Sequence, residues 1–466
     1  MRIVPLFFRH EDPRGSSRLG LLSSAVVAGL LLSLGCGGSA PPPAVPGQGT
    51  GSASAESLPS GVAVPELDSN SHNEVAVAMS PAAAEFYRAG IAAYAAGDVA
   101  GAQGQFQQAV ASDDNAAKAH FALGSTHDVM GETDRAINAY RRALDLAPAF
   151  APAVEALTKT YVRDERFSAA ETFLNDQRAQ VGDKAALLSA LAELKSAQKD
   201  SAAAQELAQR ALKISPDYKP AMVVLARDHF RNRRIDLAQY TLNAILDGYG
   251  VENPARDPEN AEARLLRALI YKQLSNRGAA IAELERVVQT RPDLVEARVN
   301  LAAFMLEAGN ADGAVPLLEG ALAYQPSNVL VHLNLGDAYR LQGRPMEALK
   351  QLEWVAKASP KLAEVHYNIG LVYLFSSGLQ GITEEQAVEQ AIEEFETYKK
   401  MRPRTRAGAG DDVEELLTRS RNKKSVLEAL KTVPPDDFDS GAKDSTTDDA
   451  SEDGTGGGDD GFDDFE

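Results

Sequence analysis

The chain has 466 residues, and its hydrophobic content of 44% is sufficient for a packed core. Its formal net charge is −19, but residues 434–466 carry −12 of it, so the remainder lacks the basic character of a nucleic-acid-binding protein. The single cysteine, Cys36, excludes an intrachain disulfide and a cysteine-based metal site.

Residues 1–35 have the composition of a secretory signal. Four arginines precede a 16-residue run of apolar and small residues between Leu19 and Leu34. A permanent membrane span needs about 20 apolar residues. We therefore predict that residues 1–35 are a cleavable signal peptide.

Cys36 follows this apolar run. The sequence Ser33-Leu34-Gly35-Cys36 resembles the bacterial lipobox, in which the peptide is cut before the cysteine and the cysteine is acylated. Gly37 stands where an aspartate usually signals retention in the inner membrane, so the resemblance implies a lipid anchor in the outer membrane, facing the periplasm. The alternative is a plain cleaved signal with a leftover cysteine.

The segment 36–80 is rich in glycine, proline, alanine and serine and has little apolar periodicity. This composition is typical of a flexible linker. We predict that it is a disordered tether behind the lipidated cysteine.

A 34-residue period organises the centre of the chain. Pro292, Pro326 and Pro360 follow it, and so do three further registers of small and large apolar residues. These registers are Ala268, Ala302 and Gly336; Ala280, Ala314 and Ala348; and Leu284, Leu318 and Leu352. Small residues let two antiparallel helices approach, large ones fill the space between hairpins, and proline ends each hairpin. The pattern resembles the tetratricopeptide repeat (TPR), which implies an all-α solenoid of stacked helix–turn–helix units.

The 34-residue frame extends in both directions. It predicts repeats 1–5 over 83–252, an eight-residue insertion at 253–260 and repeats 6–9 over 261–405. In the last repeat, the second-helix residues come nine residues late, and Thr383-Glu384-Glu385-Gln386 is a capping-box pattern. We predict a loop followed by about two extra turns at the start of that helix. Apolar residues recur at helical spacing in 411–432, and we predict a helix that caps the array.

Residues 434–466 are of low complexity and acidic, with Phe438, Phe462 and Phe465 spaced along them. Such a segment cannot bury a core, so we predict a disordered tail. It is either a solubilising extension or a docking peptide for a basic partner.

No catalytic constellation is present in the sequence. Motifs of phosphate-binding loops, zinc proteases and serine hydrolases are missing. His332 and His366 are 34 residues apart, but His120 occupies the same repeat slot, so we interpret all three as packing residues. We predict no enzymatic activity, no cofactor and no metal.

The best site candidate is a series of amides. Asn300, Asn334 and Asn368 recur at 34-residue spacing in three first helices, which line the concave face of a TPR array. A carboxamide donates and accepts hydrogen bonds, so such a ladder can bind the backbone of an extended peptide. Alternatively, asparagine is merely tolerated at an exposed slot. The neighbouring groove candidates are Asp337, Arg340 and Tyr367.

A second candidate is basic. Arg227, Arg231, Arg233 and Arg234 lie close together in repeat 5. They either meet an acidic partner, which includes the tail of this chain, or form a solvated face.

The sequence therefore predicts a non-enzymatic scaffold with protein partners in its concave groove and an N-terminal lipid in the membrane. The resemblance to lipoproteins implies an envelope machine for secretion or for motility, such as gliding or type IV pili. The alternatives are a periplasmic chaperone-like binder of unfolded outer-membrane proteins and a non-catalytic subunit of a cell-wall enzyme complex. The composition does not favour nucleic acid as a partner, and it leaves the oligomeric state open.

Overall fold

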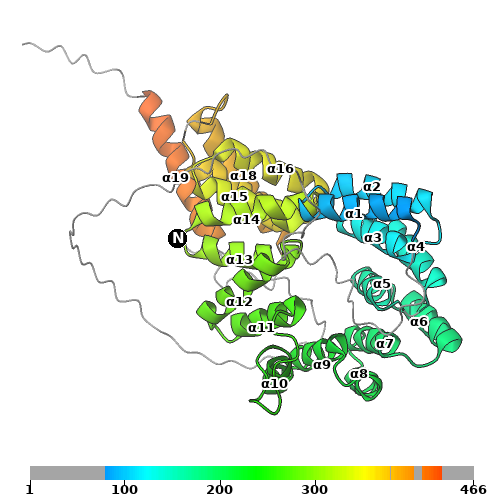
Figure 1. Ribbon diagram of the computed structural model, residues 1–466. Coiled ribbons are helices and arrows are strands. Elements are labelled where there is room, and N and C mark those ends of the chain that lie inside the picture. Colours follow the sequence, from blue (N-terminus) through cyan, green and yellow to red (C-terminus); the bar gives the residue numbers. More distant parts are fainter. Residues whose placement is uncertain (1–78, 149, 378, 403–411, 433–466) are drawn as a thin grey trace, which may run out of the picture.

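The computed structural model describes residues 79–148, 150–377, 379–402 and 412–432. These residues form nineteen helices and no β-strand. The predicted all-α solenoid is confirmed, with nine helical hairpins followed by one further helix (Figure 1). The predicted signal peptide, Cys36, the tether up to residue 78 and the acidic tail lie outside the described residues.

The first ten helices form five hairpins. Their bounds are α1 Pro81–Ala95, α2 Val99–Ser112, α3 Ala117–Val129, α4 Thr133–Leu146, α5 Ala151–Arg163, α6 Phe167–Val181, α7 Ala185–Ala197, α8 Ser201–Ile214, α9 Lys219–Arg231 and α10 Ile235–Leu246. The remaining helices are α11 Ala261–Gln273, α12 Arg277–Thr290, α13 Val295–Glu307, α14 Ala311–Tyr324, α15 Val329–Leu341, α16 Pro345–Ala358, α17 Ala363–Phe375, α18 Glu384–Met401 and α19 Val413–Thr432. The long connection between α10 and α11 contains the eight residues that interrupt the 34-residue frame.

In four hairpins, a glycine of the first helix packs against a larger residue of the second. A Cβ at Gly336 would lie 2.6 Å from Cγ of Leu352, and one at Gly370 would lie 2.6 Å from Cε1 of Phe395. Contacts this close leave no space for a methyl group. The small residues of the 34-residue period are therefore required by the approach of the two helices.

The last hairpin departs from the others as its sequence predicts. The capping box at Thr383 is present, because its hydroxyl accepts from the backbone N–H of Gln386 and the Gln386 side chain accepts from the backbone N–H of Thr383. Helix α18 has 18 residues, compared with 14 in α16. The difference is about one turn, whereas about two extra turns were expected. Glu384 and Glu385 of this turn pair with Lys423 and Lys431 of α19.

The array makes one superhelical turn and brings its first repeat against its seventh (Figure 1). The ring of Tyr94 in α1 meets the ring of Tyr324 in α14 edge-on, with centroids 5.8 Å apart. A Cβ at Gly97, just after α1, would lie 3.3 Å from Cβ of Ala323. Core residues of α1–α3 and of α13–α18 belong to one cluster as a result. We call helices α1–α14 the closed turn.

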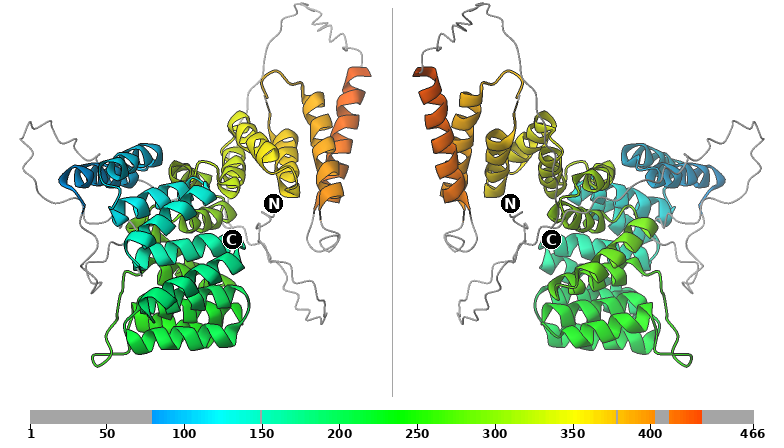
Figure 2. Two further views of the ribbon diagram at one scale, coloured as in Figure 1. Left: turned by 90° about the vertical axis from the view of Figure 1, so that its right-hand side faces the viewer. Right: turned by 90° about the vertical axis from the view of Figure 1, so that its left-hand side faces the viewer.

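Helices α15–α19, which we call the arm, extend from the closed turn (Figure 2). Helix α19 runs along α18, where Lys423 and Lys424 pair with Glu384 and Glu389. The first half of α19 buries its apolar residues, but Val426 and Leu430 in the second half are exposed. The predicted cap therefore covers the end of the array with only half of its length.

None of the described helices combines the length and the apolar character that crossing a membrane requires.

Candidate functional site

Charged side chains cross the concave face inside the closed turn. Lys159 of α5 donates to Glu262 of α11, although the two residues are 103 positions apart in the sequence. Arg227 of α9 donates to Glu193 of α7 at 2.7 Å and lies 3.8 Å from Glu262. Four first helices are thereby tied together across the groove, and we call these four residues the groove network.

The groove network is electrostatically matched. Lys159 lowers the pKa of the Glu262 carboxyl to about 2, an effect that outweighs desolvation. Burial on its own raises the pKa of Glu193, but Arg227 and Arg231 together hold that pKa below its ordinary value. Both carboxylates therefore stay ionised at neutral pH and remain available to their cationic partners.

The groove network also fills the groove. The cavity among α5, α7, α9 and α11 has a volume of about 30 Å³. A water molecule needs a cavity of at least about 10–15 Å³, so the enclosed part of this space suits water. In this state, the concave face between these four helices is occupied by the side chains of the protein itself.

The basic patch of the sequence is split by the structure. Arg227 and Arg231 bind Glu193, and Arg231 also donates to the hydroxyl of Ser196 at 2.9 Å. Arg233 and Arg234 lie in the turn before α10 and are exposed, with no ion pair to a described residue. Half of the patch is thus internal structure, and the other half is open surface.

The three asparagines of the predicted ladder also differ. The Asn300 amide donates to the carbonyl oxygen of Glu296 at 2.9 Å, and its oxygen accepts from Nζ of Lys272 at 2.8 Å. Asn334 in α15 and Asn368 in α17 are half-buried, and neither side chain hydrogen-bonds another described residue. Two amides of the ladder therefore keep their hydrogen-bonding capacity, and both lie in the arm.

The neighbouring candidates are engaged within the protein. Arg340 donates to Oδ1 of Asp337 through Nε at 2.9 Å and Nη2 at 2.6 Å, and its side chain is only 8% exposed. Tyr367 is buried against Phe395 and Tyr398.

The Tyr367 hydroxyl donates to Oδ1 of Asp412 at 2.8 Å, which joins α17 to the start of α19. The structure thus places Tyr367 in a core cluster, where we expected a side chain on the open groove.

Three segments of the chain match family models described as tetratricopeptide repeat, at residues 87–149, 223–295 and 305–367. This chain carries tetratricopeptide repeats. Arrays of such repeats are protein–protein interaction scaffolds that bind partners on their concave face, and the fold is typically non-catalytic. No curated protein matches the sequence.

Solved structures resemble the TPR array only loosely. They include the Cut9–Hcn1 hetero-tetramer of the APC/C, at 14% identity over 72% of this chain and 76% of that one, with a TM-score of 0.46. A tetratricopeptide repeat protein from Parabacteroides merdae is 16% identical over 74% of this chain and all of its own, with a TM-score of 0.28. MamA from AMB-1 is 21% identical over 39% of this chain and 96% of its own, with a TM-score of 0.31.

The histidines that share a repeat slot pack inside the TPR array. His332 stacks on Trp354 with ring centroids 3.8 Å apart, and its Nε2 lies 2.8 Å from the carbonyl oxygen of Pro326. His366 bonds Glu394 through Nδ1 at 2.7 Å. Across the described helices and turns, no three His, Cys, Asp or Glu side chains converge as a metal site would require.

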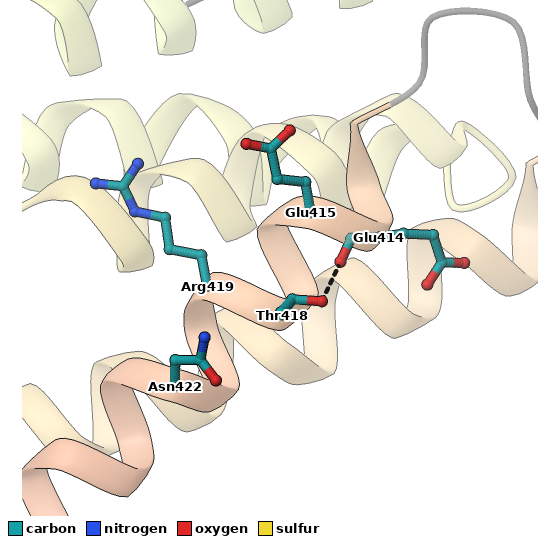
Figure 3. Close-up of a pocket in the computed structure, with 5 residues that line it drawn as sticks. All are labelled: Glu414, Glu415, Thr418, Arg419 and Asn422. Carbon is teal, nitrogen blue, oxygen red and sulfur yellow. Dashed lines mark hydrogen bonds between the residues drawn. The ribbon is translucent and has the colours of Figure 1, made fainter.

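The arm also has a hollow on α19 (Figure 3). Glu414, Glu415, Thr418, Arg419 and Asn422 line it, all from one helix, and their side chains spread apart. The Thr418 hydroxyl donates to the carbonyl oxygen of Glu414 at 2.8 Å, and the Arg419 guanidinium covers the ring of Phe375. The hollow therefore lacks the converging polar groups of a ligand site.

Sequence reasoning missed the groove network, although the repeat frame contains its signal. Lys159, Glu193 and Arg227 occupy one slot in three successive repeats and alternate in charge. Glu262 and Glu296 likewise share a slot in the next two repeats. Alternating charge at the repeat period predicts ion pairs between neighbouring first helices, and such pairs compete with a partner for the concave face.

Proposed function

We propose that this protein is a non-enzymatic scaffold that binds an extended protein segment along the concave face of its arm, at Asn334 and Asn368. The availability of these two amides supports the proposal, because Asn300 in the same repeat slot is satisfied by Lys272 and by its own helix. Carboxamides placed one repeat apart can pair with successive backbone groups of an extended chain. The two amides thus hold the backbone of the partner, and the partner's side chains contribute selectivity through other contacts.

Site-specific photo-cross-linking tests this assignment. A photoreactive residue is placed at Asn334, at Asn368 or, as the control, at exposed Met346 on the second helix α16. The captured proteins are then identified by mass spectrometry. We expect the same small set of partners from both asparagine positions and not from Met346. A matching set from Met346, or no adduct at either asparagine, contradicts the proposal.

The matched affinity test compares Asn334→Ala plus Asn368→Ala with Asn300→Ala. Each lost hydrogen bond is worth about 0.5–1.5 kcal/mol, so the double variant should bind the captured partner about 5- to 150-fold more weakly. Asn300→Ala should change the affinity less than threefold, because that amide is already satisfied. Equal losses in the two variants would show that the distinction between the arm and the closed turn is irrelevant to binding.

We further propose that the scaffold is anchored in the bacterial outer membrane by lipid on Cys36, faces the periplasm and holds components of an envelope-spanning machine for secretion or motility. The sequence around Cys36 supports the anchor. Labelling with a palmitate analogue should mark the wild type, and Cys36→Ser should abolish the label and move the protein to the soluble fraction. An unlabelled, soluble wild type contradicts the anchor and leaves the groove assignment intact.

A further inference from the structure

An exposed aromatic patch lies on the outside of the array, at the point where the repeat frame is interrupted. Leu237 and Tyr240 of α10 are 49% and 63% exposed, and Tyr249 and Val251 in the following loop are 43% and 100% exposed. Helix α10 is the second helix of its hairpin and lies at the outer edge of the closed turn (Figure 1). The patch is therefore separate from the concave face and from the arm.

The patch is held in shape by its own contacts. The rings of Tyr240 and Tyr249 stack with centroids 4.9 Å apart, and the Tyr249 hydroxyl donates to the carbonyl oxygen of Tyr240 at 2.6 Å. The loop is closed by hydrogen bonds from the backbone N–H groups of Tyr249 and Asp257 to the carbonyl oxygens of Asn253 and Ile245. Preorganised aromatic surface that remains exposed marks an interaction site.

One end of the patch is positively charged. Arg233 and Arg234 immediately precede α10, and Leu237 lies about one helical turn beyond Arg234. Helix α10 begins without a side-chain cap, so the N–H groups of its first turn add partial positive charge there. Asp236 is the acidic residue of that turn, which leaves two arginines against one carboxylate.

We propose that this patch, defined by Arg233, Arg234, Leu237, Tyr240, Tyr249 and Val251, binds residues 461–466 of this chain. That segment reads Gly-Phe-Asp-Asp-Phe-Glu, so two phenylalanines alternate with three carboxylates. The phenylalanines match the exposed leucine and tyrosines, and the carboxylates match the two arginines. About 9 Å of helix separates Arg234 from Tyr240. The Cα atoms of Phe462 and Phe465 lie about 10 Å apart in an extended chain, so one short segment covers both ends of the patch.

Photo-cross-linking of the full chain tests this docking. A photoreactive residue replaces Phe465 in one protein and Phe438 in the control, because Phe438 lies in the same acidic segment outside the proposed motif. We expect adducts from position 465 to map to residues 233–251. The yield of these adducts should be at least fivefold higher than the yield from position 438. Adducts spread along the chain, or an equal yield from position 438, overturn the proposal.

Charge reversal is the second part of the test. Arg233→Glu plus Arg234→Glu should lower the yield from position 465 at least fivefold, and so should Tyr240→Ser. The exposed Met346→Ser serves as the control. All of these positions are on the surface, so helical circular dichroism should stay unchanged and a loss of folding cannot mimic the result. An unaffected yield in both patch variants overturns the proposal. Mixing light and ¹⁵N-labelled chains shows whether the segment docks on its own chain or on a second copy, and either source satisfies the proposal.

Discussion

The closed turn and the arm are built from the same repeat, yet their concave faces differ. In the closed turn, first helices carry residues of opposite charge that pair across the groove, and the first and seventh repeats meet through Tyr94 and Tyr324. In the arm, Asn334 and Asn368 lie about one helical turn before the slot that Lys159, Glu193 and Arg227 share, and their amides pair with no described residue. The comparison shows how one repeat can serve either as internal structure or as open binding surface, depending on whether its groove side chains satisfy each other.

The two regions also differ in how they are stabilised. The closed turn is supported at both ends because its terminal repeats touch, whereas the arm joins the closed turn mainly through α15 and ends in a half-packed α19. In a solenoid, stability is approximately the sum of repeat terms and nearest-neighbour terms. We therefore expect the arm to unfold before the closed turn.

The largest expected effect comes from deleting a core ring of the arm. Phe395 is fully buried against Tyr367 and Gly370, and Phe395→Ala should cost the arm about 3–5 kcal/mol. Trp354, the single tryptophan, lies in α16 and reports on the arm, whereas circular dichroism reports on all helices. In urea, the fluorescence midpoint should fall well below the circular dichroism midpoint.

Tyr140→Ala in the closed turn is the matched control, because Tyr140 fills the same slot against Gly124. This variant should move the circular dichroism transition more than the fluorescence transition. If both probes shift together in both variants, the arm and the closed turn are one cooperative unit and the comparison fails.

A disulfide across the junction tests closure directly. Cβ atoms at positions 97 and 323 would lie 3.3 Å apart, close to the range of about 3.5–4.5 Å found in disulfides. In a Cys36→Ser background, Gly97→Cys plus Ala323→Cys should oxidise readily, and the oxidised variant should be about 2–4 kcal/mol more stable than the reduced variant. The positive φ of residue 97 costs both forms the same amount, about 1–2 kcal/mol. Thiol titration and denaturation with and without reductant measure both effects. Two thiols that stay free under mild oxidation contradict the closed turn in solution.

The repeat period predicted the hairpins well because it records contacts between neighbouring helices. Ala302, Ala314 and Leu318 are buried where the frame places them. Closure could not be predicted, since Tyr94 and Tyr324 are 230 positions apart and their contact depends on small rotations accumulated over seven repeats.

The site was predictable in part. The frame aligns Tyr367 with Leu333 and Val299, both buried, so the sequence itself contained the signal that Tyr367 is a core residue. The frame also aligns three asparagines, but it could not show that Lys272 donates a hydrogen bond to one of them, Asn300. That difference depends on a side chain from the preceding repeat reaching across the groove.

Acidification should weaken the groove network of the closed turn. The pKa of Glu262 is lowered from an ordinary value of 4.5 to about 2, so its contribution to folding is complete above pH 4.5 and is lost between pH 4.5 and 2. Glu262→Gln should be less stable than the wild type at pH 7 and should lose less stability across that window. Thermal unfolding at a series of pH values measures this loss of stability.

Glu206→Gln, at an exposed position on α8, is the control and should follow the wild type. A wild-type slope in Glu262→Gln would show that the cross-groove contact does not stabilise the fold.

The smallest expected effect concerns the turn between the two helices of a hairpin. Eight turns hold one residue with positive φ at the repeat period, and glycine occupies this position in four of them, for example Gly97 and Gly343. Lys199 occupies it in the closed turn with a φ of 67°. A side chain in this region costs about 1–2 kcal/mol, whereas glycine costs about 0.5–1 kcal/mol in lost chain entropy. Lys199→Gly should therefore stabilise the closed turn by about 0.5–1 kcal/mol in urea denaturation followed by circular dichroism.

Lys199→Ala removes the same exposed side chain and keeps the strain, so it should match the wild type. If both variants change stability equally, the lysine side chain, and not its backbone conformation, sets the stability of this turn.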